Sequence, residues 1–143
     1  MLFVIDSNEY IFAFGPERES IAFSLLEILV NLHAVRIPRT IFEEVKRNLS
    51  PEAFTEFNNF INTIATVDED IVVPFEIVFK YEANGLKPSD AFIAAYAEWT
   101  GADILVTENR HFLSRQSDLP FKVLTSEKCL KIILKPPHPN PLP

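Results

Sequence analysis

Acidic side chains recur where a short apolar stretch ends or where a helix is predicted to begin. The carboxylate and amide residues at such places are Asp6, Glu43, Glu44, Asp90, Glu108 and Asn109. Carboxylates that converge on one point repel each other, and burial increases the cost. They stay ionised together only if a cation neutralises them, and oxygen ligands without sulfur or imidazole favour Mg²⁺ or Mn²⁺. The pattern therefore predicts a divalent metal site.

A divalent cation held by carboxylates lowers the pKa of a bound water and shields a phosphate for in-line attack. That is the chemistry of metal-dependent nucleases and phosphatases. A Cys/His zinc site is not expected, because three histidines and one cysteine rarely supply four ligands at the right spacing. The three glycines are too few for a Gly-rich phosphate-binding loop.

The elements that must bring these residues together alternate between short apolar runs and amphipathic segments. The predicted strands are Leu2–Ile5, Ala34–Ile37, Ile104–Val106, Phe121–Leu124 and one of Ala65–Val67 or Ile71–Val73. Helices are predicted at Glu17–Leu32, from Thr40, from Ser50, and at Pro74–Ala83, Pro88–Thr100 and Ser126–Leu134. The alternation predicts an α/β fold with a central, mostly parallel sheet of four to five short strands. Ligands bind such sheets at the carboxyl ends of the strands, which is where Asp6 and Glu108 stand.

Composition sets the limits of this prediction. The 143 residues fit one domain, and a hydrophobic content of 48% excludes disorder over the whole chain. We expect a domain at residues 1–135 and an extended proline-rich tail at residues 136–143. The lone Cys129 excludes a disulfide framework. The chain has no signal-peptide pattern and no apolar run long enough to span a membrane, so a cytoplasmic location is expected.

The formal net charge of −7 argues against a protein that grips nucleic acid with a broad basic face. The charge is unevenly spread, since residues 104–143 carry six of the 13 basic side chains but only three of the 20 acidic ones. Part of the acid excess belongs to the predicted metal site. The segment after Thr107, with Arg110, Arg115 and Lys122, could supply a local basic patch beside it.

Four blocks of sequence together resemble the PIN-domain family, of the VapC type. They are Val4–Asn8, Ile41–Val45, Gly85–Ala95 and Gly101–Phe112, and the last two are the most diagnostic. The resemblance implies a three-layer α/β/α fold and Mg²⁺- or Mn²⁺-dependent cleavage of RNA. It also implies frequent homodimers and, in toxin–antitoxin pairs, an antitoxin protein that blocks the site.

The resemblance assigns roles to individual residues. Asp6 matches the first acid of the family and Asp90 the third, while Asn8 and Thr107 match polar residues that support the site. The second acid is Glu44 or Glu43. Glu44 is favoured because it precedes a hydrophobic residue, as in the family pattern.

The capping-box pattern Thr40-x-x-Glu43 gives Glu43 a competing role at the start of its helix. At the fourth acidic position the family has Asp, whereas this chain has Asn109. Either the adjacent Glu108 serves as the metal ligand in place of this Asp, or a water bridges Asn109 to the metal. This departure affects the ligands of a second metal more than those of the first.

The leading hypothesis is a metal-dependent endoribonuclease, with Arg110 and Arg115 either contacting RNA phosphates or pairing with neighbouring acids. The alternative is a catalytically weak PIN domain that binds RNA or protein. A receiver-like or dehalogenase-like phosphotransfer domain ranks lower. Those domains need an acid beside the first Asp or two residues after it, where this chain has Ser7 and Asn8.

Overall fold

A parallel sheet forms the centre of the molecule in the computed structural model, which describes residues 1–16, 20–115 and 119–134. The described residues form five strands in the order β3-β2-β1-β4-β5. Their bounds are β1 (Leu2–Ile5), β2 (Ala34–Pro38), β3 (Ala65–Asp68), β4 (Ile104–Val106) and β5 (Lys122–Leu124). Every neighbouring pair is parallel. The expected mostly parallel sheet of four to five strands is confirmed.

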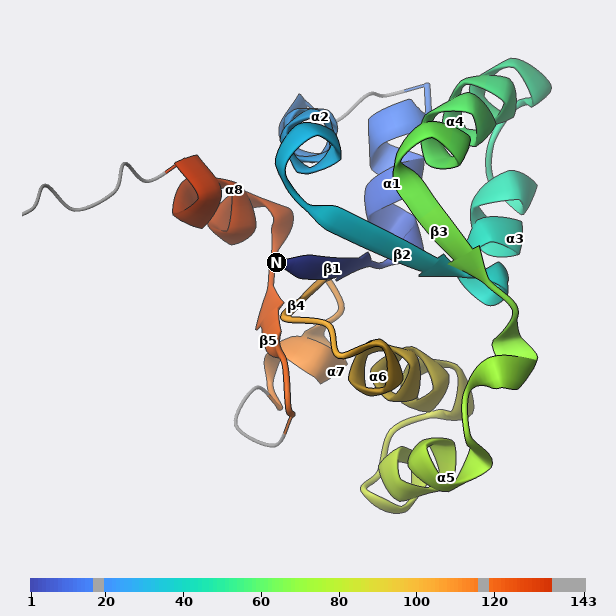
Figure 1. The fold of residues 1–143 in the computed structure, drawn as a ribbon, viewed down its shortest axis with the longest axis vertical. Helices are drawn as coiled ribbons and strands as arrows, with labels where there is room; N and C mark the ends of the chain where they lie inside the picture. Colours follow the sequence, from blue (N-terminus) through green and yellow to red (C-terminus); the bar gives the residue numbers. More distant parts are fainter. Residues whose placement is uncertain (17–19, 116–118, 135–143) are drawn as a thin grey trace, which may run out of the picture.

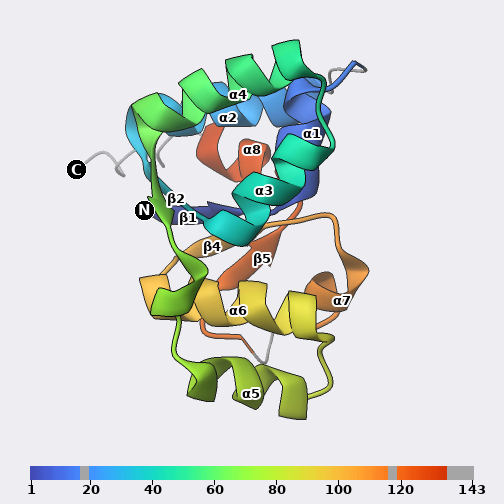
Figure 2. The same ribbon diagram turned by 90° about the vertical axis from the view of Figure 1, so that its right-hand side faces the viewer.

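Helices cover both faces of this sheet and complete three layers (Figures 1 and 2). On one face lie α1 (Ser7–Phe14), α2 (Ser20–Leu32), α3 (Arg39–Arg47), α4 (Pro51–Ile64) and α8 (Ser126–Leu134). On the other lie α6 (Pro88–Thr100) and α7 (Arg110–Leu113), with α5 (Phe75–Ala83) packed outside α6 and preceded by the 3₁₀ turn η1 (Asp70–Val72). The α/β/α architecture expected from the sequence is therefore present.

The chain order creates a switch point beside β1. From β1 the chain moves outward to β2 and β3, and then crosses the other face of the sheet to β4 on the opposite side of β1. Crevices form where connections leave a parallel sheet in opposite directions, at the carboxyl ends of the strands. The carboxyl ends of β1 and β4 are thus the natural place for a site.

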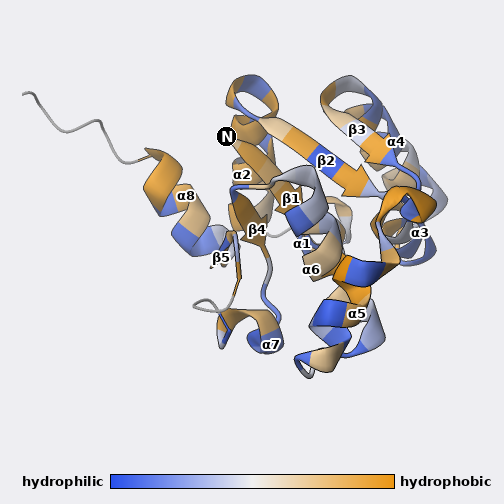
Figure 3. Ribbon diagram, turned by 60° about the horizontal axis from the view of Figure 1, so that its bottom comes forward, coloured by the Kyte–Doolittle hydropathy of each residue, from blue (hydrophilic) through white to orange (hydrophobic). Residues whose placement is uncertain are grey.

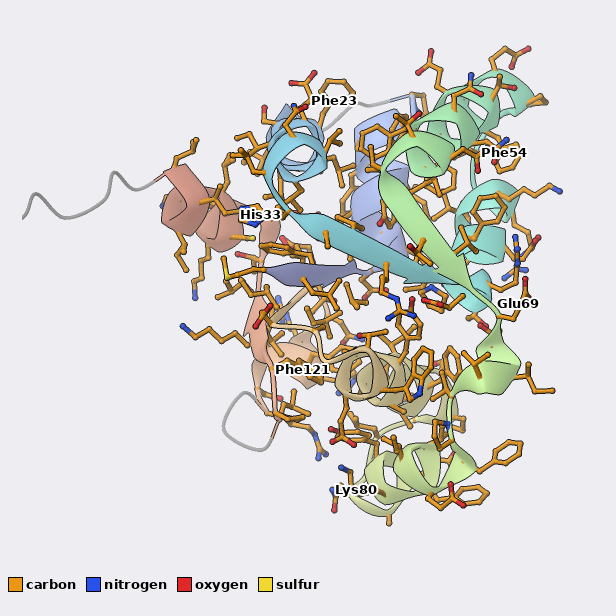
Figure 4. All side chains as sticks on the ribbon, in the orientation of Figure 1. Phe23, His33, Phe54, Glu69, Lys80 and Phe121 are labelled. Atoms are coloured by element: carbon orange, nitrogen blue, oxygen red, sulfur yellow. The ribbon has the colours of Figure 1, made fainter. Side chains whose placement is uncertain are left out.

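Apolar side chains hold the sheet between its two helical layers. Phe3, Val4 and Ile5 of β1 are completely buried, and β1, β2 and β4 are coloured mostly as hydrophobic in Figure 3. On the α3–α4 side, Phe54 lies near Phe42, with 5.7 Å between ring centroids (Figure 4). Phe42 also contacts the buried Phe57. These aromatic rings belong to the core rather than to a base-stacking surface.

Helix α1 was not expected from the sequence. Its residues are hydrophobic on more than one side, and its buried positions include Ser7, Glu9 and Tyr10, so no single apolar stripe marks it. Asp6 begins the helix as its N-cap. The helix predicted at Glu17–Leu32 is observed as α2 from Ser20, and residues 17–19, like the predicted tail, lie outside the described residues.

Two local predictions about caps and strands are resolved by contacts from distant segments. Ala65–Asp68 is the strand beside β2, whereas Ile71–Val73 falls largely in η1. The predicted capping box of Thr40 and Glu43 is wrong. Pro38 is the N-cap residue of α3, while the backbone N–H and hydroxyl of Thr40 both donate to Asp70. A carboxylate from η1 thus replaces the local partner.

An ion pair joins the strands to the helix that carries Asp90. Arg36 on β2 donates two hydrogen bonds to Asp68 on β3, at 2.9 and 2.8 Å. The hydroxyl of Tyr96 on α6 donates to the same carboxylate at 2.5 Å. Burial raises the pKa of Asp68, but the hydrogen bonds from Arg36 and Tyr96 outweigh it and hold the pKa below its usual value. None of the helices within the described residues is long and apolar enough to cross a membrane.

Candidate metal centre

Asp6 and Thr107 lie side by side at the carboxyl ends of β1 and β4. The register pairs Ile5 with Val106, and the Asp6 N–H donates to the Val106 carbonyl at 2.9 Å. The Thr107 hydroxyl donates to Asp6 Oδ2 at 2.7 Å, and Thr107 is fully buried. The two residues are therefore fixed to each other by the sheet itself.

The Asp6 carboxylate also caps α1, because its Oδ1 accepts a hydrogen bond from the Ser7 N–H at 2.8 Å. Burial raises the pKa of Asp6, and the hydrogen bonds from Thr107 and Ser7 offset only part of this effect. Repulsion from Glu44 and Asp90 raises it further. Asp6, Glu44 and Asp90 thus lie within electrostatic reach of one another.

Asn109 links Thr107 to Asp90. Its backbone N–H donates to Thr107 Oγ1 at 3.0 Å, and its Nδ2 donates to Asp90 Oδ1 at 3.1 Å. Its Oδ1 accepts from the His111 N–H at 2.9 Å and so caps α7. Asn109 thus connects Thr107 to Asp90, and its role as a metal ligand stays a prediction.

The site is thus a connected network of Asp6, Thr107, Asn109 and Asp90, which we call the switch-point network. Glu44 acts on the Asp6 carboxylate, whereas Glu43 acts electrostatically on Arg39. That arrangement favours Glu44 over Glu43. Asn8 is exposed on α1, and the hydrogen bonds to Asp6 come from Ser7 and Thr107 instead.

Glu108 is turned away from this network. Its Oε2 lies 3.4 Å from the Ser126 N–H, and its side chain neighbours Glu9. Its expected place beside Asp6 and Asp90 is instead taken by Asn109, because Thr107 and α7 fix the backbone between them.

Glu9 is a functional candidate that the sequence reasoning missed. It is 2% exposed, although it is a carboxylate on the first turn of α1. Burial raises its pKa to about 8, and repulsion from Glu108 and Asp6 adds to the shift. The signal was a lone Glu three residues after Asp6 in an apolar segment, but it has meaning only once α1 is recognised.

The basic residues are divided between the two ends of the sheet. Arg110 is exposed at the start of α7. The Arg115 guanidinium donates to the Asn84 carbonyl at 2.6 Å and lies over Gly85, whose φ of 98° and lack of a side chain allow the approach. Lys122 lies opposite Ile104, at the amino ends of the strands, so the expectation that it stands beside the site is wrong.

The donor chemistry of the network fits a hard divalent cation, because the Asp6 carboxylate is desolvated and is repelled by Glu44 and Asp90. Across residues 1–16, 20–115 and 119–134, no group of three or more Asp, Glu, His or Cys side chains is close enough to hold a metal ion jointly. Mg²⁺ commonly uses only one or two carboxylates and keeps several waters. Asp6 and Asp90 are the residues that fit this mode of binding.

Comparison with solved structures identifies the fold. No protein-family model and no curated protein matches the chain. VapBC2 from Rickettsia felis, bound to a DNA fragment from its promoter, is 17% identical over 87% of this chain and 98% of the other, with a TM-score of 0.61. FitAcB from Neisseria gonorrhoeae is 15% identical over 87% and 98%, with a TM-score of 0.59.

A PilT N-terminus domain protein from Sulfolobus solfataricus is 16% identical over 98% of this chain and 99% of the other, with a TM-score of 0.57. At these identities the likeness concerns the fold alone. The chain has the PIN, or PilT N-terminus, fold.

Proposed function

We propose that this PIN-fold protein is an endoribonuclease that hydrolyses RNA phosphodiester bonds with the help of Mg²⁺ or Mn²⁺. One observation carries the proposal. The switch-point network joins two carboxylates through Thr107 and Asn109 at the carboxyl edge of the sheet, where α/β folds bind ligands.

In this proposal Asp6 and Asp90 hold the cation, with Glu44 close by to complete its charge balance. When bound, the metal supplies a water of lowered pKa and neutralises the phosphate. Thr107 keeps Asp6 Oδ2 in place, and Asn109 keeps Asp90 in place by its amide. Arg110 and Arg115 contact the RNA phosphates. Attack of water on the phosphorus would break its bond to the 3′-oxygen and leave 5′-phosphate and 3′-hydroxyl ends.

The similar solved structures also support a proposal about protein partners. Two of the similar structures are the VapBC2 and FitAcB assemblies, so we propose that this chain is the toxin of a toxin–antitoxin pair. The proposal includes an antitoxin that covers the carboxylate edge, and a homodimer. Co-expression of this chain with the protein encoded by a neighbouring gene, followed by light scattering, tests for the antitoxin complex. Light scattering of this chain alone tests for the homodimer.

The activity is tested by incubating the purified protein with RNAs of varied sequence and Mn²⁺ or Mg²⁺, beside Asp90→Asn. We expect this variant to lose on the order of 100-fold or more in cleavage rate, because metal stabilisation of the transition state is worth several kcal/mol. Glu44→Gln should also reduce the rate, whereas Glu43→Gln is the matched control that should not.

The outcomes separate the two functions that the sequence allows. Equal cleavage by the wild type and Asp90→Asn would show that a contaminant is responsible and would overturn the proposal. Mn²⁺ binding that Asp90→Asn abolishes, without cleavage of any RNA by the wild type, would instead favour the binding module. That alternative has one supporting feature, which is the Asn109 amide at the usual position of an acid.

A further inference from the structure

The carboxylate of Glu9 is buried, and the residues that the structure describes satisfy only one of its two oxygens. Its Oε2 accepts a hydrogen bond from the Ser126 hydroxyl, but Oε1 has no hydrogen-bond partner among the residues that the structure describes. The residue is 2% exposed, so bulk water does not solvate this oxygen. Buried polar atoms are nearly always paired, and an orphan of this kind points to a water or an ion.

Within residues 1–16, 20–115 and 119–134, the charges that act on Glu9 are not balanced by a positive group. The charged groups that act on it are Glu108 and Asp6, both negative. Glu127 lines the same cavity, but it pairs with Lys131 at 3.3 Å on its own helix and so has its counter-charge. Glu9 and Glu108 face each other, and repulsion and a side-chain hydrogen bond between them add to the burial that raises the pKa of Glu9. The metal-free pair therefore keeps a proton, and a cation in its place would neutralise both carboxylates.

A small cavity gives a cation room beside this pair. It measures about 170 Å³ and is lined by Glu9, Phe12, Ile21, Ala22, Glu108, Ser126 and Glu127. At roughly 30 Å³ per water, that volume takes an ion with several of its waters. The available donors are oxygens only, and Mg²⁺ typically binds through one or two carboxylates while it keeps most of its hydration.

We propose that Glu9 and Glu108 bind a second divalent cation, Mg²⁺ or Mn²⁺, next to Ser126 and apart from the switch-point network. Glu108 is exposed and gives the ion a route from solvent, while Glu9 closes the inner side of the cavity. At the fourth acidic position this chain has Asn109 instead of an acid. The carboxylates of Glu9 and Glu108 would provide the missing negative charge. Binding itself does not depend on nuclease activity; only the catalytic role of the second ion rests on the proposed function.

Glu9 is three residues from Asp6 on the same turn of α1, and Glu108 stands between Thr107 and Asn109. Each proposed ligand is therefore tied through the backbone to a member of the switch-point network. Both proposed sites therefore lie where the chain leaves the carboxyl ends of β1 and β4. Paired metal ions can stabilise both the attacking and the leaving oxygens of a phosphodiester.

The test is the number of Mn²⁺ ions bound by the full chain, measured by calorimetry and by electron paramagnetic resonance without RNA. The wild type should bind two ions. Glu9→Gln and Asp90→Asn should each bind one, since each removes a different site. Glu127→Gln is the matched control on the cavity rim and should still bind two.

Glu108→Gln serves as a second variant, because the exposed position of Glu108 tolerates substitution even if Glu9→Gln should fail to fold. One ion in the wild type, or two in both Glu9→Gln and Glu108→Gln, would overturn the inference; a proton shared by the two carboxyl groups would then explain the orphan oxygen. The proposed nuclease fails by a different readout, namely RNA cleavage that survives Asp90→Asn.

Discussion

At the scale of single residues, Asp6 combines two tasks. One carboxylate oxygen caps α1 and the other accepts from Thr107, so the same group starts a helix and faces the candidate site. Its orientation depends on a buried hydroxyl that does not itself need to touch a metal. Groups that orient metal ligands in this way commonly account for 10–100-fold in metal affinity.

We therefore expect Thr107→Val to bind Mn²⁺ about 10–100-fold more weakly at the Asp6 site, because the valine keeps the shape but removes the donor. Titration calorimetry measures this. Thr107→Ser retains the hydroxyl and should restore most of the affinity. An affinity unchanged in Thr107→Val would show that the hydroxyl does not position Asp6.

Glu9 makes the stability of the metal-free protein depend on pH. Its pKa rises from 4.5 to about 8 on folding, so the folded state holds its proton more tightly. The resulting stability is fully present below pH 4.5 and is lost as the pH rises through 8. Denaturant melts in EDTA should show a decline on the order of a few kcal/mol across this window, and Glu9→Gln should flatten it.

A decline of equal size in Glu9→Gln would assign the pH dependence to another group. Asp6, whose pKa is also raised by burial, would then be the next candidate.

At the scale of elements, the position of α6 determines where Asp90 lies. Tyr96 ties this helix to Asp68 on β3, and Arg36 ties the same carboxylate to β2. The side chain of Asp68 is 12% exposed, and the pair is bidentate. A second pair, Arg39 with Glu69, has similar geometry but lies at the surface, with Glu69 58% exposed.

Asp68→Asn should lower the free energy of unfolding by about 1–3 kcal/mol, since it removes a charged partner from hydrogen bonds that are partly buried. Glu69→Gln is the matched control and should change it by less than about 1 kcal/mol. Because the pKa of Asp68 is held low, its contribution is lost only as the pH falls through that lowered value. Equal effects of the two substitutions in urea melts would contradict this account.

The sequence predicts elements well where an apolar or small-residue segment is bounded by polar, proline or glycine residues. Leu2–Ile5, Pro88–Thr100, Ile104–Val106 and Ser126–Leu134 are observed with the predicted bounds. The sequence does not predict α1, whose buried face includes Glu9. It also does not predict the four-residue α7, whose N-cap is Asn109. The direction of Glu108 was equally out of reach, because it depends on Ser126, which lies 18 residues away in sequence.

At the scale of the whole molecule, the net charge of −7 opposes general binding to RNA. Of the three basic residues expected beside the site, Arg110 begins α7 and Arg115 follows this helix, whereas Lys122 lies at the other edge. We therefore expect few phosphates to be neutralised. The charge favours binding that depends on metal and on local contacts.

The logarithm of the RNA affinity should fall with the logarithm of salt concentration at a slope of about −1.4, as expected for two phosphates on a single strand. Fluorescence anisotropy with Asp90→Asn, which binds without cleaving, measures this slope. Arg115→Ala should make it shallower by about 0.7, and Lys122→Ala should leave it unchanged. A slope several times steeper would reveal a basic surface beyond the two arginines.

The placement of β1 between β2 and β4 also bears on how the protein is made. Asp6 is synthesised well before its hydroxyl partner Thr107, which follows 101 residues later. Contacts this distant in sequence form late, because a long loop must close first. A chain still growing on the ribosome carries Asp6, Glu44 and then Asp90 without the strand that unites them. The proposed nuclease is therefore inactive beside the RNA of its own ribosome until Thr107 has left the ribosome and β4 has paired with β1.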